Sequence, residues 1–83
     1  MTQEELNEIL KKHKLWLRGE AGGERFLAGY GENFRGLDFS LADLRHANLP
    51  GADLTGANLI CANLTNADLH SANLTNACLR SAT

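Results

Sequence analysis

The sequence predicts an all-β solenoid, a chain wound into stacked coils, with an α-helical cap at its N-terminus. From residue 42 onward, alanine recurs at every fifth position nine times, and leucine follows two residues after each alanine as far as Leu79. The two residues that close each five-residue unit favour turns, with Gly, Pro, Asn and Ser prominent among them. The first seventeen residues lack this period and place apolar residues three and four apart, as an amphipathic helix does.

A period of five fits neither a straight helix nor a flat strand. On a helix, each five-residue step would rotate leucine by about 140°, so the leucines would spread around the circumference. On a flat strand, an odd period would place successive leucines on opposite faces. Within one unit, Ala and Leu share a face, and the Asp or Asn between them points away. All leucines can therefore face inward only if the last two residues of each unit turn a corner.

These Ala-(Asp/Asn)-Leu-x-x units resemble the pentapeptide-repeat family, and the resemblance covers residues 32–82. It implies a right-handed quadrilateral β-helix with about twenty residues per coil, so that residues twenty apart stack. We therefore expect two parts, an N-terminal helix with a capping loop over residues 1–31 and a β-helix over 32–83. The implied inward residues are Leu44, Leu49, Leu54, Leu59, Leu64, Leu69 and Leu74, and the implied outward residues are Asp43, Asn48, Asp53 and Asn58.

The N-terminal segment is predicted to cover the first coil, because the end of a solenoid exposes unpaired strand edges. A helix is expected over residues 3–17, with Thr2 and Glu5 forming a capping box and Gly19 ending the helix. Trp16 lies on the apolar face of this helix. We expect it to pack on the first coil near Phe34 or Phe39.

Composition and motif spacing argue against several classes of function. A net charge of −2 provides no basic field for nucleic acid, and no stretch is apolar enough to span a membrane. Two cysteines make no disulfide scaffold, so we expect a cytoplasmic chain with reduced thiols. The aspartates would lie on a convex surface, and the three histidines lack the spacing of a metal cluster. We expect no enzymatic activity, no cofactor and no metal.

Outer positions that depart from small polar residues are the candidate partner-binding sites. Ile60 should stack between Ser40 and Arg80, with other apolar residues beside it. Contact with a partner, contact with the N-terminal segment and variation without function all remain open for this surface. The candidate residues are Leu41, Arg45, His46, Ile60 and Cys61.

No second cap follows Leu79, and the chain ends while still in register. Either a second copy covers this end, or the sequence is truncated or unusually short. We expect a homodimer joined C-terminal coil to C-terminal coil about a two-fold axis, with a foreign partner chain as the alternative cover. The residues expected at the joint are Leu74, Cys78, Leu79, Arg80 and Ala82.

The resemblance implies a non-enzymatic, rod-like inhibitor or adaptor that binds a bacterial or phage-host protein. Some members of the family resemble duplex DNA and bind topoisomerases in its place. The repeat region here carries four aspartates against Arg45 and Arg80, which is little charge with which to imitate a phosphate backbone. The alternative is a structural spacer or assembly fragment of a longer repeat protein.

Overall fold

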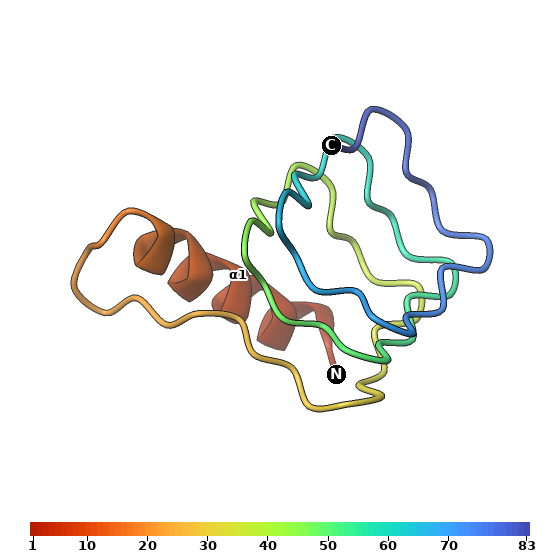
Figure 1. Ribbon diagram of the computed structural model, residues 1–83, viewed down its shortest axis with the longest axis horizontal. Helices are drawn as coiled ribbons and strands as arrows, with labels where there is room; N and C mark the ends of the chain where they lie inside the picture. The colour runs from red at the N-terminus through yellow and green to blue at the C-terminus, as the bar shows by residue number, and fades with distance from the viewer.

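The computed structural model describes all 83 residues as one α-helix, α1 (Gln3–Leu17), followed by a loop and a series of stacked coils. The helix covers one end of the stack, and the last coil lies at the opposite end (Figure 1). The molecule measures 36 × 26 × 23 Å, so a single chain is only slightly elongated.

Helix α1 begins and ends where the sequence predicts. The Thr2 hydroxyl accepts a hydrogen bond from the Glu5 N–H at 3.1 Å, and the Glu5 carboxylate accepts one from the Thr2 N–H at 2.9 Å. These reciprocal bonds satisfy two donors that the first turn would otherwise leave free, and they lower the pKa of Glu5. The predicted capping box is therefore confirmed.

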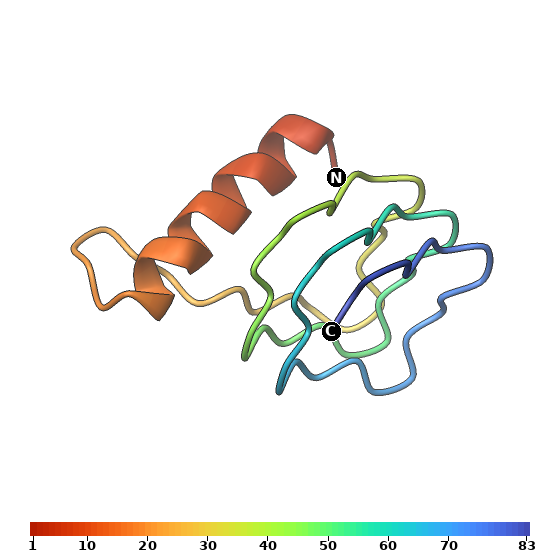
Figure 2. The ribbon, with the colours of Figure 1, turned by 90° about the horizontal axis from the view of Figure 1, so that it is seen from above.

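The coils pair through seven isolated parallel bridges. Six of these bridges join residues twenty positions apart, as in Asp43 with Asn63 and Asp53 with Asn73. The first bridge, between Leu27 and Asn48, has a spacing of twenty-one. The expected twenty-residue coil agrees with these pairs, and Figure 2 shows the coils one above another. A continuous β-sheet does not form, because a corner in every unit leaves only one residue per unit in a bridge.

Each five-residue unit carries the residues that make its own corner. The second corner residue has a positive φ in every unit from Gly31 to Ser81. At one such corner the Ala47 N–H donates to the Leu44 carbonyl at 3.0 Å, which together with the φ of 63° at His46 defines a type II turn. The Asp or Asn of most units also accepts a hydrogen bond from the N–H two residues later, as Asp53 does from Thr55 at 3.1 Å.

The core lies along the axis of the coils and is complete at only one end. Phe34 and Phe39 are fully buried, as are the inner residues Leu44, Leu49, Leu54 and Leu59. Leu64, Leu69 and Leu74 point inward but remain half-buried, because no further coil covers them. The predicted inward orientation of the leucines is thus confirmed, and burial declines toward the C-terminal end.

Candidate functional site

Helix α1 caps the first coil with polar side chains as well as apolar ones. The Gln3 side chain donates from Nε2 to the Asp38 carbonyl at 2.8 Å, and its Oε1 accepts from the Asp38 N–H at 2.8 Å. This pair of bonds takes the place of the backbone bridge that a preceding coil would supply. The sequence did not indicate that Gln3 would bond the coil backbone, because a polar residue near the start of a helix is common on exposed surfaces.

His13 joins the helix to two parts of the first coil. Its ring is fully buried, and Nδ1 accepts a hydrogen bond from the Phe26 N–H at 2.9 Å. The proton therefore lies on Nε2, which donates to the Arg45 carbonyl at 2.8 Å. Burial lowers the pKa of His13, because a charged imidazolium would lose solvation there. His13 is thus a neutral structural contact within the cap.

The prediction for Trp16 was wrong, because Phe26 occupies the expected position. The Phe26 ring packs edge-on against Phe34 at 5.8 Å between centroids. Trp16 remains 38% exposed, stacks on His13 at 5.6 Å and lies under the Arg25 guanidinium at 5.6 Å. Since His13 already faces the coil, Trp16 falls at the rim of the helix–coil contact.

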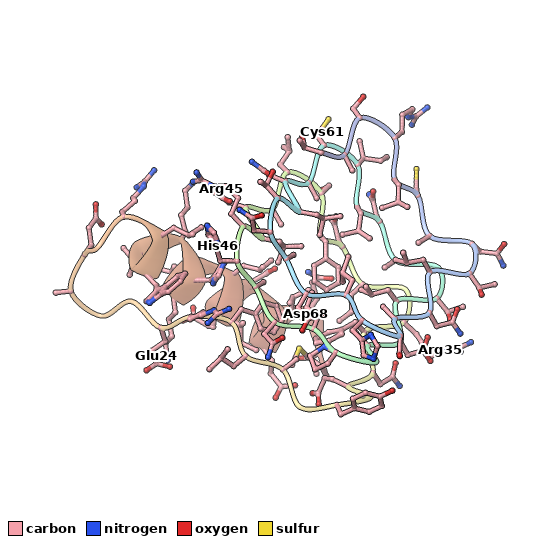
Figure 3. All side chains as sticks on the ribbon, viewed as in Figure 1. Glu24, Arg35, Arg45, His46, Cys61 and Asp68 are labelled. Carbon is pink, nitrogen blue, oxygen red and sulfur yellow. The ribbon has the colours of Figure 1, made fainter.

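Three of the five candidate partner-binding residues meet at one edge of the coils. The Leu41 N–H donates to the Ile60 carbonyl at 2.9 Å, and Cys61 follows Ile60 at the same corner. Leu41 is 79% exposed and has a φ of 61°, and Cys61 is exposed with a φ of 60°. We name Leu41, Ile60 and Cys61 the Leu41 corner. Figure 3 shows the Cys61 sulfur projecting outward at this edge.

The other two candidates, Arg45 and His46, lie on the next corner, beside the cap (Figure 3). The Arg45 guanidinium contacts the Asp43 carboxylate at 2.7 Å, which lowers the pKa of Asp43 and raises that of Arg45. The His46 carbonyl accepts a hydrogen bond from the Arg25 Nε at 2.8 Å. The Arg45 guanidinium is therefore paired within the chain, whereas the exposed His46 ring forms no hydrogen bond there.

The residues predicted for a dimer joint lie at the open end of the stack. The N–H groups of Leu69, Leu74 and Leu79 form no hydrogen bond within the chain, and neither do the Ala72 and Ala77 carbonyls. Leu79 is 42% exposed, while Cys78 is half-buried and free of any disulfide. This end therefore presents backbone donors, backbone acceptors and apolar side chains together.

A groove of about 300 Å³, which the sequence did not indicate, lies between α1 and the segment 24–34 that leads into the first coil. Apolar side chains and five charged residues line it. Among them are Glu8, Ile9, Lys12, Phe26, Leu27 and Phe34.

The charged groups form no centre typical of catalysis. No three His, Cys, Asp or Glu side chains are placed to hold a metal ion. The pKa values of Asp38 and Asp53 are lowered, first by hydrogen bonds from the hydroxyls of Ser40 and Thr55. Helix α1 is neither long nor apolar enough to cross a membrane.

The comparison with known families agrees with the repeat pattern. A family model described as pentapeptide repeats matches eight copies over residues 33–59 and 51–83. This match covers more than half of the chain, so the chain belongs to the pentapeptide-repeat family. The family implies a β-helix, and its members are typically protein-interaction modules without enzymatic activity. No curated protein sequence matches the chain closely enough to count as a relative.

Proposed function

We propose that this protein is a non-enzymatic binding module that acts as an inhibitor or adaptor of a bacterial or phage-host protein and contacts it through the Leu41 corner. The observation that carries the proposal is Leu41 itself, a large apolar side chain left 79% exposed on left-handed backbone. Holding a residue other than glycine at this φ costs on the order of 1–3 kcal/mol. Every unit of the repeat has a positive φ at this position, and the turn bond from the Ala42 N–H to the Phe39 carbonyl at 3.0 Å holds it here. What distinguishes Leu41 is a large exposed apolar side chain where most units have Gly, Asn or Ser, and beside Ile60 and Cys61 it favours a contact outside the chain.

Glycine provides a sharp test of this proposal. Leu41→Gly should raise the free energy of unfolding by about 1 kcal/mol, because relief of the strained φ outweighs the added freedom of the unfolded chain. The same variant should lose the partner in affinity capture from a bacterial lysate followed by mass spectrometry. Ser71→Gly is the matched control, since it relieves a similar φ of 59° at a corner outside the proposed surface and should capture the same proteins as wild type. Identical captured proteins from wild type and Leu41→Gly would rule out the Leu41 corner.

A more specific form of this function is the imitation of duplex DNA to bind a topoisomerase. The charges of the coil support it less than the apolar Leu41 corner supports a general protein contact. Asp43 pairs with Arg45, and Asp53 lies 3.4 Å from Arg35. Two of the four aspartates of the coil are therefore neutralised, whereas imitation of a phosphate backbone needs rows of free negative charge. Recognition of the apolar corner thus has the stronger support.

We further propose that two copies join through their C-terminal coils. The unpaired N–H groups of Leu74 and Leu79 support this arrangement, because exposed strand edges tend to pair. The half-buried Leu74 and exposed Leu79 side chains would also be covered at such a joint. A C-terminal joint would also turn a slightly elongated monomer into a rod with a helical cap at each outer end. The same edge would serve a spacer or assembly element, which is the alternative function.

Sedimentation equilibrium tests the dimer. Wild type should have twice the monomer mass at micromolar concentration, and Leu79→Asp should be monomeric because it places a charge at the joint. Arg35→Asp, an exposed charge change on an earlier coil, should leave the mass unchanged. A monomeric wild type with an unaltered melting temperature in Leu79→Asp would exclude the dimer.

A further inference from the structure

We propose that the last coil joins a second copy of this chain in one register, in which Asn73 lies opposite the partner's Cys78 and Asp68 lies opposite the partner's Thr83. The inference rests on the proposed C-terminal dimer and identifies the residues that pair across its joint. Helix α1 covers the other end of the stack (Figure 1), so a copy can stack only on the open end of another copy. Chains that join through the same end are related by a two-fold axis. Their facing strands run antiparallel, because a half-turn about an axis across the stack reverses the direction in which the chain winds.

The free backbone groups of the last coil follow a fixed pattern. Within each unit, the unpaired carbonyl comes directly before the central residue and the unpaired N–H directly after it. The free N–H groups are those of Leu69, Leu74 and Leu79, and the free carbonyls include those of Ala72, Ala77 and Ala82. When two such strands run antiparallel, the N–H after one central residue meets the carbonyl before the other. The two central residues then lie directly opposite each other.

The shape of the last coil decides which central residues face each other. Bridges between residues twenty apart give four five-residue units per coil, one on each side. The central residues of the four sides of the last coil are Asp68, Asn73, Cys78 and Thr83. Neighbouring coils are about 4.8 Å apart, so each unit advances about 1.2 Å along the stack. The open end is therefore a spiral ramp that projects least at Asp68 and furthest at Thr83.

Two copies of this ramp fit together about one two-fold axis, which passes through the corner at Thr75. About that axis the strand that projects furthest in one copy meets the strand that projects least in the other, so all four sides approach to about 4.8 Å. An axis through the Cys78 side would leave the two Asp68 strands about 9.6 Å apart. An axis through the Asn73 side would make the two Thr83 strands overlap, and the remaining corner axis would leave two sides too far apart to bond.

In this register every free leucine N–H of the last coil finds an acceptor. Each donates to the carbonyl of the alanine before the facing central residue: Leu74 to the partner's Ala77, Leu79 to the partner's Ala72 and Leu69 to the partner's Ala82. Symmetry gives the same bonds in return. The joint therefore continues the hydrogen bonding of the stack from one chain into the next.

The charges of the last coil support the same register. Asp68 and Arg80 are its acidic and its basic side chain, both are exposed, and neither forms a salt bridge within the chain. Across the joint, Arg80 lies opposite the partner's Ser71, three residues from the partner's Asp68 and within reach of a long side chain. Opposite charges thus meet at two symmetry-related places, and no aspartate faces another.

Disulfide trapping tests the register, because directly opposed residues of such a pair have Cα atoms about 4.5 Å apart, a distance that a disulfide spans. The parent protein is Cys61→Ser, which leaves Cys78 as its one thiol. Asn73→Cys is added to this parent, once with Cys78 retained and once with Cys78→Ser. Although Asn73 accepts a bond from the Thr75 N–H at 3.0 Å, Cys78 occupies the same place in the next unit, so the repeat tolerates cysteine there.

Oxidised glutathione accepts the two electrons of each disulfide, and non-reducing electrophoresis measures the covalent dimer. The variant with both thiols should form covalent dimer at least tenfold faster than either protein with one. Cys78 and the partner's Cys78 lie on neighbouring sides of the coil and point apart, so they should not bond without backbone movement. The same separation holds for two thiols at position 73.

Sedimentation equilibrium of the reduced proteins separates failure of the register from failure of the dimer. If Cys78 alone traps the dimer as fast as both thiols do, the axis passes through the Cys78 side and the register is wrong. Equally fast trapping by the single thiol at position 73 would place the axis on that side instead. A dimer in sedimentation that no thiol traps would also reject the register, whereas a monomeric parent at micromolar concentration would reject the C-terminal dimer itself.

Discussion

The backbone hydrogen-bonding groups at the two ends of the coil stack are satisfied to different extents within the chain. At the N-terminal end, side chains of α1 bond the backbone of the first coil, with Gln3 on Asp38 and His13 on Phe26. At the C-terminal end, the amides of Leu74 and Leu79 have no partner within the chain. The comparison teaches that a helix can close a coil edge when its polar side chains match the backbone, while an apolar lid alone would leave buried donors unpaired.

The largest expected change in the free energy of unfolding comes from truncating a buried leucine, and its size should differ between the two ends of one leucine column. Leu54 is fully buried, and Leu74, twenty residues later, is half-buried. Leu54→Ala should lower the free energy of unfolding by about 3–5 kcal/mol, enough to unfold a domain of this size. Leu74→Ala should cost less than half as much when the protein is monomeric. Urea titration followed by circular dichroism measures both variants, and equal losses would mean that the open end is covered in the monomer.

The next effect concerns the polar part of the cap. Gln3→Ala removes two hydrogen bonds to Asp38 and should cost about 1–2 kcal/mol. Asn7→Ala is the control, because the exposed Asn7 side chain makes one hydrogen bond, from the Gln3 Nε2 at 3.0 Å, and Gln3→Ala removes that bond as well. Chemical denaturation of both variants gives the comparison. A loss in Asn7→Ala as large as that in Gln3→Ala would show that the bonds to Asp38 contribute little.

A smaller effect is expected from pH, through His13. Its pKa is lowered in the folded protein, so the unfolded chain binds a proton that the folded chain does not. The free energy of unfolding should therefore be highest above the ordinary histidine value of 6.5 and fall as pH decreases from there toward the lowered pKa. Thermal melting between pH 7.5 and pH 5 should show this loss in wild type, and His13→Gln should show much less. Equal pH dependence in the two proteins would mean that a group other than His13 causes the loss of stability.

Much of the repeat region could be predicted from the sequence because its information is local. Each unit contains its inward Leu, its turn residues and, in most cases, an Asp or Asn such as Asp53 that bonds its own corner. The same holds for the start of α1, where Thr2 and Glu5 lie three residues apart. Local rules of this kind are repeated many times along the chain, so a single irregular unit does not obscure them.

The cap contacts could not be predicted, because they depend on where the helix lies against the first coil. His13 and Trp16 share one helical face, and only the packing decides that His13 enters the core while Trp16 stays at the rim. The bonds between Gln3 and Asp38 depend on the same placement. Five-residue periodicity also could not indicate that bridges would remain single rather than extend into a sheet.

Hydrogen exchange at individual amides tests the contrast between the two ends most directly. The Phe26 and Asp38 amides are bonded by the cap and should exchange slowly at every protein concentration. The Leu74 and Leu79 amides should exchange slowly at high concentration, where two copies cover them, and rapidly after dilution to monomer. Rapid exchange at Phe26 and Asp38, or concentration-independent exchange at Leu74 and Leu79, would contradict the proposed difference between a closed end and an end that a second copy completes.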